Sequence, residues 1–192
     1  MLHIRPATDS DRDAIWEIFR EVIAAADTYP LDPKISREDA FGYWFKDNAH
    51  VYIAEQRGEF VGEAVSFHGT ATPSPTVMDQ NRAIVGTYTL HPNQAGGGGH
   101  VANAAFIVAR NTRGQGIGRA LGEHCLEQAR RLGFRAMQFN FVVSTNESAV
   151  KLWQTLGMKI VGTLPGAFRH PQKGYVDVYV MFQSLLPAND AN

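Results

Sequence analysis

Residues 100–131 read HVANAAFIVARNTRGQGIGRALGEHCLEQARR, and three patterns follow one another in them. The stretch opens with an apolar run over 101–109, which is typical of a buried strand. A short polar corner follows and leads to Gly114, Gly116 and Gly118. Beyond the glycines, apolar residues recur every three or four positions, the spacing of one helix face. The sequence therefore predicts a strand, a tight glycine turn and a helix whose N-terminus opens on that turn.

The glycine corner has the features of a phosphate-binding site. The first backbone N–H groups of a helix lack internal partners, and the helix dipole makes that end positive. Glycine lets a ligand approach the backbone without meeting a Cβ atom. Arg113 at the edge of the corner and Arg119 one turn inside can each add a charge-assisted hydrogen bond. The corner lacks the Gly-Lys-Ser/Thr end of a P-loop, and a strand–helix turn that uses glycine only for its shape is the alternative.

The six residues from Arg113 to Gly118 match the pattern Gln/Arg-x-x-Gly-x-Gly/Ala. In this respect the chain resembles the GNAT superfamily of N-acetyltransferases, in which this corner grips the pyrophosphate of acetyl-CoA. The resemblance implies an acyltransferase that uses acetyl-CoA as cosubstrate and needs no metal. The coenzyme-binding residues that it implies are Phe106, Ile107, Val108, Arg113, Gly114, Gln115, Gly116, Ile117, Gly118, Arg119, Asn146 and Trp153.

Residues 146–158 resemble a second motif of that family, Asn-x-x-Ala-x-x-Leu-Tyr-x-x-x-Gly-Phe. Asn146 stands at its start, where family members hydrogen-bond the coenzyme. Trp153 stands where the family often has a tyrosine that serves as general acid for the departing thiolate. An indole N–H donates a hydrogen bond but is no useful acid at neutral pH. The thiolate must then take its proton from water or another group, or leave unassisted.

The resemblance also implies the architecture. It predicts an α/β (α+β) GNAT fold: a central mixed, mostly antiparallel sheet with a splayed parallel strand pair, flanked by about four helices. The parallel pair consists of the strand at 101–109 and a second buried strand at 135–143, joined by the central helix. We expect a single acetyltransferase domain over 1–183 and a disordered C-terminal tail over 184–192.

The rest of the chain supplies the other expected elements. They are a strand at 3–7, helices at 8–26, 36–45 and 146–156, a hairpin formed by 50–56 and 61–68, and strands at 83–90, 158–161 and 175–182. Residues 69–81 and 164–173 are expected to be loops, and the glycine-rich segment 91–99 a hairpin loop or a mobile lip over the acceptor site. Gly62 and Gly86 stand in similar settings, so either of their strands can hold the third place in the sheet.

The strands at 101–109 and 135–143 each carry one asparagine in an apolar run. The segments HVANAAF, RGQGIG, FNFVVSTN, LW and GTLP are together similar to the branch of the family that acetylates L-azetidine-2-carboxylate, a proline analogue. That resemblance implies a small-molecule amine acceptor and makes Asn103 and Asn140 catalytic residues that orient it. Two core amides that brace the strand pair are the alternative, since an unpaired buried amide costs roughly 1–3 kcal/mol. Asparagine is not a base, so the proton of the acceptor amine is expected to pass to water, with His100 as a candidate for the general base.

Composition excludes several other classes. A net charge of −1 provides no basic surface for nucleic acid. No apolar run has the length of a membrane span, and the charges within residues 1–20 differ from a signal peptide. The single cysteine, Cys125, lies on the apolar stripe of its helix, which indicates a core thiol in a cytoplasmic protein. A phosphinothricin-type amine or a protein N-terminus as acceptor, a non-catalytic CoA-binding module, and a homodimer all stay open.

Overall fold

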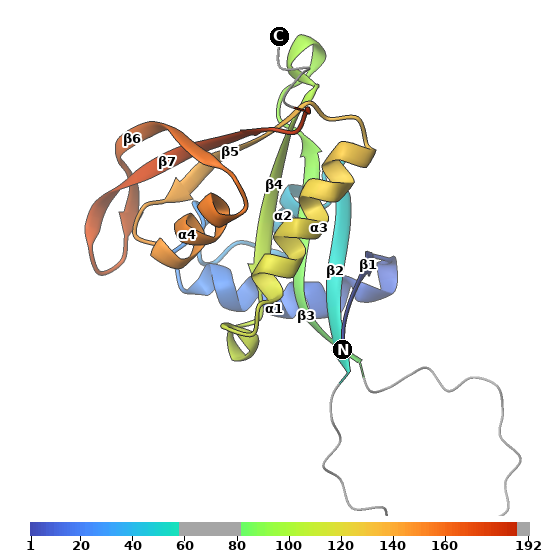
Figure 1. Ribbon diagram of the computed structural model, residues 1–192. Helices are drawn as coiled ribbons and strands as arrows, with labels where there is room; N and C mark the ends of the chain where they lie inside the picture. Colours follow the sequence, from blue (N-terminus) through green and yellow to red (C-terminus); the bar gives the residue numbers. More distant parts are fainter. Residues whose placement is uncertain (58–81, 188–192) are drawn as a thin grey trace, which may run out of the picture.

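The structure is a computed structural model that describes residues 1–57 and 82–187 (Figure 1). A seven-stranded sheet forms its centre, in the order β1-β2-β3-β4-β5-β7-β6. The strands are β1 (Leu2–Pro6), β2 (His50–Arg57), β3 (Arg82–Pro92), β4 (Val101–Val108), β5 (Ala136–Val143), β6 (Lys159–His170) and β7 (Gly174–Ser184). The α-helices are α1 (Arg12–Ala24), α2 (Arg37–Trp44), α3 (Ile117–Arg131) and α4 (Glu147–Thr155). The predicted mixed, mostly antiparallel sheet is confirmed, because β4 and β5 are the only parallel pair among the described strands.

The helices cover both faces of the sheet (Figure 1). On one face, α3 buries its apolar stripe, including Leu121 and the predicted core thiol of Cys125, against β3, β4 and β5. On the other face, α1 and α2 pack a second core around Phe19 and Trp44. The two ring centroids lie 5.4 Å apart, edge to face. The aromatic residues of α2 therefore contribute mainly to core packing.

β4 and β5 are paired over only a short length. Their parallel register consists of Val101 with Ala136 and Ala102 with Met137, after which the strands separate. β5 continues instead as the partner of β7, with an irregular register between Phe139 and Val142. Figure 1 shows β5 and β7 turning away from β4. The backbone of β4 beyond residue 102 thus lacks a strand partner on the side of β5.

The third-strand place belongs to β3. β3 pairs with β2 on one side and β4 on the other. Gly86 lies where α3 crosses the sheet, and a Cβ atom there would come within 2.9 Å of Leu121 and 3.1 Å of the Ile107 carbonyl oxygen. The glycine therefore permits the close approach of α3 to β3. The predicted strand at 61–68, with Gly62, lies outside the described residues.

The C-terminal strands differ from the prediction. β6 continues through His170, whereas the sequence predicted a loop over 164–173. The strand absorbs Pro165 and Gly166 in a bulge, seen as a register shift between Leu164 and Phe168, with φ of +59° at Gly166. At the other end, β7 includes Ser184, and Leu185 is 7% exposed in the core, so these two residues are part of the packed domain.

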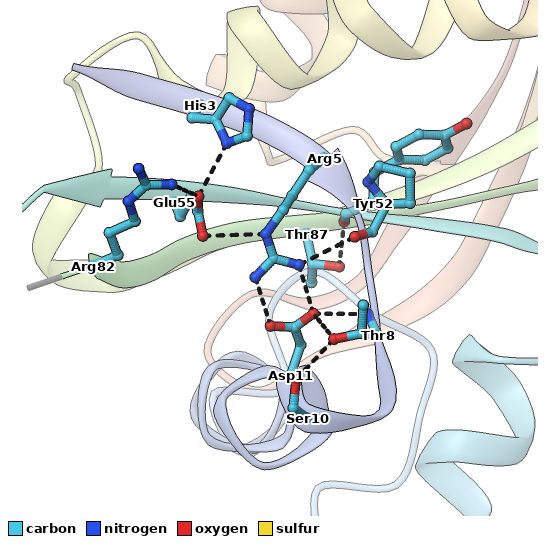
Figure 2. Close-up of polar contacts among 10 residues, drawn as sticks. His3, Arg5, Thr8, Ser10, Asp11, Tyr52, Glu55, Arg82 and Thr87 are labelled. Atoms are coloured by element: carbon cyan, nitrogen blue, oxygen red, sulfur yellow. Dashed lines mark hydrogen bonds and ion pairs between the residues drawn. The ribbon is translucent and has the colours of Figure 1, made fainter. Parts of the chain in front are cut away.

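A network of charged side chains ties β1, β2, β3 and the start of α1 together (Figure 2). Glu55, which is 5% exposed, accepts a hydrogen bond from Arg5 Nε at 3.2 Å and one from Arg82 at 2.5 Å, and contacts His3 Nδ1 at 3.0 Å. The other two guanidinium nitrogens of Arg5 donate to Asp11 at 2.8 Å each. Asp11 also accepts from the backbone and hydroxyl of Thr8, which completes the predicted helix cap.

Candidate active site

A cleft of about 670 Å³ opens where β4 and β5 separate. β4 and β5 form its two sides. The end of β3, the start of α3, one side of α4, the end of α2 with the residues after it, and the segment after α1 also line it. All but two of the residues predicted for the site line this cleft. The predicted residues that line the cleft are Asn103, Phe106, Ile107, Val108, Arg113, Gly114, Gly116, Gly118, Arg119, Asn140, Asn146 and Trp153. Gln115 does not line it, and the side chain of Ile117 is 3% exposed in the core beneath α3.

One end of the cleft is the glycine corner at the N-terminus of α3. Gly114 and Gly116 both have φ of +80°, a left-handed conformation that side chains other than glycine rarely adopt. A Cβ atom built on either would meet no atom within 4 Å, so the space over both is open to a ligand. Arg113 lines this end, as does Arg119, whose Nε donates to Glu123 at 2.9 Å. Open backbone, a helix N-terminus and two guanidinium groups together fit a pyrophosphate.

The backbone of β4 presents hydrogen-bonding groups to the cleft. Ala109 N donates to Val85 O, and Asn93 N donates to Val101 O, so the odd-numbered residues of β4 are those that bond to β3. The N–H groups of Ala104, Phe106 and Val108 consequently point toward the gap with β5. Tyr29 donates its hydroxyl proton to the carbonyl of Phe106 at 2.7 Å. The predicted coenzyme contact at Ile107 is therefore limited, since its backbone groups face β3.

An aromatic cluster forms the wall beside α4. The ring centroid of Trp153 lies 4.7 Å from that of Phe106 and 5.0 Å from that of Phe139. Trp153 is 8% exposed and donates no hydrogen bond to any described residue. Asn146 caps α4, because its side-chain oxygen accepts from Ala149 N at 3.3 Å. That oxygen is occupied, so only the amide NH₂ of Asn146 is available to a ligand.

The other end of the cleft holds the two predicted asparagines. Asn140 donates to Asn93 Oδ1 at 2.6 Å and accepts from Gln138 Nε2 at 2.8 Å. Both the amide oxygen and the amide nitrogen of Asn140 are therefore bonded to neighbouring side chains. Asn103 has no side-chain hydrogen bond among the described residues, and it stands directly opposite His91 in the β3–β4 register.

Several cleft residues with polar side chains were not among the predicted site residues, and five of them are used below. They are Tyr29, Tyr43, Lys46, Thr89 and His91. A signal for two of them was present, because in the apolar run at 83–90 and just beyond it, polar residues stand at 87, 89 and 91, all on one face of the strand. The hydroxyl of Thr89 is buried and unpaired among the described residues.

The histidine near the cleft is not the one that the sequence favoured. His100 is exposed, bonds through Nδ1 to the Gly97 carbonyl at 3.0 Å and does not line the cleft. His91 is 7% exposed and does line it. Burial lowers the pKa of His91, a hydrogen bond to the Pro92 carbonyl opposes that shift, and the charge of Lys46 lowers the pKa further. Burial also lowers the pKa of Lys46 and raises that of Tyr43.

Two negative findings hold for the part of the chain that the structure describes. It contains no group of three or more His, Cys, Asp or Glu side chains placed to hold a metal ion. It also contains no helix with the length and apolar character needed to cross a membrane.

Comparisons with known proteins agree with this geometry. Residues 13–158 match the family described as "Acetyltransferase (GNAT) family". The N-acetyltransferase aca1 of Schizosaccharomyces pombe is 31% identical over 159 residues, which are 82% of this chain and 72% of that protein. A GCN5-related N-acetyltransferase from Kribbella flavida is 39% identical with a TM-score of 0.78, covering 95% of this chain and 97% of that one.

A GNAT superfamily phosphinothricin acetyltransferase from Sinorhizobium meliloti, solved in complex with AcCoA, shares the fold. Its TM-score is 0.72 at 19% identity, over 95% of this chain and 88% of that one. The fold, with its splayed strands and glycine corner, defines an acyltransferase that uses acetyl-CoA. The chain belongs to the GNAT acetyltransferase family and is an acetyl-CoA-dependent N-acetyltransferase.

Proposed function

We propose that the protein transfers the acetyl group of acetyl-CoA to the amine of a small molecule that carries a carboxylate, in the manner of azetidine-2-carboxylate. The observation that carries the proposal is the composition of the cleft end opposite the glycine corner. The unbonded amide of Asn103 and the ammonium of Lys46, which has no ion-pair partner among the described residues, line it together. An amide and a cation suit an amine and a carboxylate of one small substrate.

The direction of the cleft supports this assignment of its two ends. The glycine corner follows directly on the end of β4, so the pyrophosphate belongs there, beside Arg113 and Arg119. The thioester end of the coenzyme then lies toward the point where β4 and β5 part, beside Asn103 and Asn140. The backbone N–H groups of β4 that face the gap are placed to hold the pantetheine and polarise the thioester carbonyl.

The residues then divide into two roles. Asn103 orients the attacking amine, and Asn140, already held by Asn93 and Gln138, shapes the site near the thioester. Trp153 packs beside the pantetheine rather than acting as an acid. Orientation of the two substrates in one ternary complex supplies the main part of the rate enhancement.

An acceptor panel tests the proposal, with thiol release from acetyl-CoA as the readout. The panel pairs azetidine-2-carboxylate with azetidine, which lacks the carboxylate, and adds proline analogues, phosphinothricin and peptides. We expect kcat/KM for azetidine-2-carboxylate to exceed that for azetidine by tenfold or more, about 1.4 kcal/mol. Lys46→Met should remove most of this difference, because the cation that distinguishes the two amines is gone.

The matched control is Lys151→Met, which neutralises an exposed lysine on α4 outside the cleft. It should keep the full preference for the carboxylate. A preference for peptides, or equal rates with azetidine and azetidine-2-carboxylate, would contradict a carboxylate-bearing small molecule as the acceptor.

A further inference from the structure

We infer that the imidazole of His91, at the end of β3, is the group that accepts the proton of the acceptor amine. The inference rests on the proposed function, since it concerns how that amine becomes a nucleophile. An aliphatic amine is mostly an ammonium ion at neutral pH and has no lone pair for attack until it loses a proton. The cleft must therefore contain a proton acceptor or a path to water.

The lining of the cleft leaves few candidates. The titratable side chains among the described lining residues are Tyr29, Tyr43, Lys46, His91, Arg113 and Arg119. No aspartate or glutamate is among them. Arginine and lysine are cationic near neutral pH, and tyrosine is a protonated phenol, so none of these accepts a proton readily. Histidine is the one side chain in this set that does so.

The hydrogen bond of His91 sets its tautomer. Nδ1 lies 2.8 Å from the backbone carbonyl oxygen of Pro92. A carbonyl oxygen only accepts, so Nδ1 carries the hydrogen and donates it. In the neutral ring, Nε2 then has a free lone pair, and the bond of Nδ1 is the one side-chain hydrogen bond of His91 to the described residues. This is the form that a general base requires.

The surroundings of His91 keep the ring neutral and place it beside the substrate. Burial and the charge of Lys46 lower its pKa, while the bond to Pro92 opposes them. The other polar groups of the lining are Tyr43 at the end of α2, Lys46 just after it, Tyr29 in the segment after α1, and Asn103 on β4. No carboxylate among these groups stabilises the imidazolium, so the proton is passed on to solvent rather than retained. Opposed residues on antiparallel strands have Cβ atoms roughly 4.5–5.5 Å apart, so one amine can reach both Asn103 and His91.

The proton balance follows directly. The ammonium gives one proton to Nε2 of His91, which becomes imidazolium. The free amine forms the new N–C bond, the C–S bond breaks, and the electron pair of that bond leaves on sulfur. The second N–H proton goes to the thiolate, and the imidazolium returns the first to solvent. The products are the N-acetyl compound, the thiol of coenzyme A and one proton.

The test compares His91→Asn with His100→Asn, using azetidine-2-carboxylate as acceptor. Asparagine retains a donor near the place of Nδ1, so the bond to the backbone carbonyl can persist, but it has no counterpart of Nε2. His100 also bonds a carbonyl through Nδ1, outside the cleft, which makes it the matched control. We expect His91→Asn to lower kcat/KM by roughly 10²- to 10⁴-fold and to abolish the acidic limb of its pH profile, with acetyl-CoA affinity unchanged by calorimetry. The His100→Asn variant should keep the wild-type kcat/KM and the acidic limb of the pH profile.

A second readout needs no acceptor. Nitrogen chemical shifts of the wild-type protein should show His91 protonated on Nδ1 alone near neutral pH, and its titration midpoint should lie below 6.5. An Nε2-protonated ring, or a His91→Asn enzyme with full rate and an intact acidic limb, overturns the inference and leaves the proposed function standing. A wild-type enzyme that ignores azetidine-2-carboxylate and proline analogues contradicts the proposed acceptor, and the tautomer and midpoint then decide the role of His91 by themselves.

Discussion

At the scale of single residues, Trp153 shows how the chain departs from its family motif. The indole occupies the place of a tyrosine, yet it is buried between Phe106 and Phe139 and bonds to nothing polar among the described residues. We expect Trp153→Phe to change kcat by less than about threefold and to lower the melting temperature, because the smaller ring leaves a gap in the cluster. A hundredfold loss of kcat, about 2.7 kcal/mol of barrier, with unchanged coenzyme affinity would give the indole a chemical role.

The two asparagines should separate in their responses to mutation. Asn103→Ala removes an amide that has no other described partner, so we expect acetyl transfer to fall by roughly one to three orders of magnitude with near-normal acetyl-CoA binding and stability. Asn140→Ala leaves Asn93 and Gln138 without their partner, so transfer, coenzyme binding and melting temperature should all fall. Kinetics, calorimetry and thermal unfolding of both variants check this. Lower stability with normal turnover in both would assign the pair to core bracing.

The sequence identifies those cleft residues that stand in a distinctive local pattern. The glycine corner and both asparagines could be found because each stands out from its neighbours along the chain. For His91 the pattern of polar residues at 87, 89 and 91 is the one local signal, and its place opposite Asn103 on the face toward α2 depends on strand pairing that is not visible along the chain. His100 was the candidate because the ordinary pKa of a histidine suits proton transfer, but in the structure it is exposed and bonded to the Gly97 carbonyl.

At the scale of elements, the N-terminus of α3 is the part whose function depends on backbone shape. Gly116→Val puts a branched side chain into the open space over the corner, so we expect acetyl-CoA affinity to fall at least tenfold by calorimetry. The left-handed conformation of Gly116 will also make the variant less stable. A loss of acetyl-CoA affinity in this variant alone would therefore not distinguish a blocked site from a destabilised fold.

Gly133→Val provides the control at the other end of the same helix. Gly133 has φ of +82° and nothing within 4 Å of a Cβ position, nearly the same values as Gly116. Both variants should lose similar stability, and only Gly116→Val should lose coenzyme affinity. Equal affinities in two folded variants would show that the corner does not bind the pyrophosphate.

Element prediction succeeds where one periodicity persists and fails where composition conflicts with it. The apolar runs of β4 and β5 and the stripe of α3 could be predicted, because burial imposes a pattern on every residue of those elements. The start of β6 was predicted at 158–161, but its continuation to His170 could not be, because Leu164-Pro165-Gly166 has the composition of a loop. A bulge in pairing with β7 accommodates it, and that pairing is invisible along the chain.

At the scale of the whole molecule, the network around Arg5 makes the free energy of unfolding depend on pH in the acidic range. A hydrogen bond from Arg5 lowers the pKa of Asp11 from 3.8 to about 2, against the opposing effect of burial. Burial also raises the pKa of Glu55, but hydrogen bonds from His3 and Arg82 and the charge of Arg5 outweigh it, and the net shift is downward. Because both folded pKa values lie below their unfolded ones, the stabilisation is present above those unfolded values and is lost as pH falls through the folded ones.

We therefore expect the free energy of unfolding to decline between about pH 5 and pH 2, with Asp11 contributing up to about 2 kcal/mol of the decline. Asp11→Asn should be less stable than the wild type at pH 7 and should lose less stability on acidification. Urea unfolding of both proteins across this range measures the two slopes. Parallel curves would contradict the assigned role of the Arg5–Asp11 pair.

The register of β2 with β3 has a consequence for how the length of this chain can vary. Arg57, the last residue of β2, is the partner of Arg82, the first residue of β3. The backbones of these two residues are therefore adjacent, and a two-residue Asn-Gly turn could join the same strands. The entropy of closing a loop changes only slowly with its length, so segments of very different size can be exchanged here at little cost to the sheet. Arg82 bonds to Glu55, and neither Arg57 nor Arg82 lines the cleft, so the strands can be joined here by segments of different length without a change in the described cleft residues.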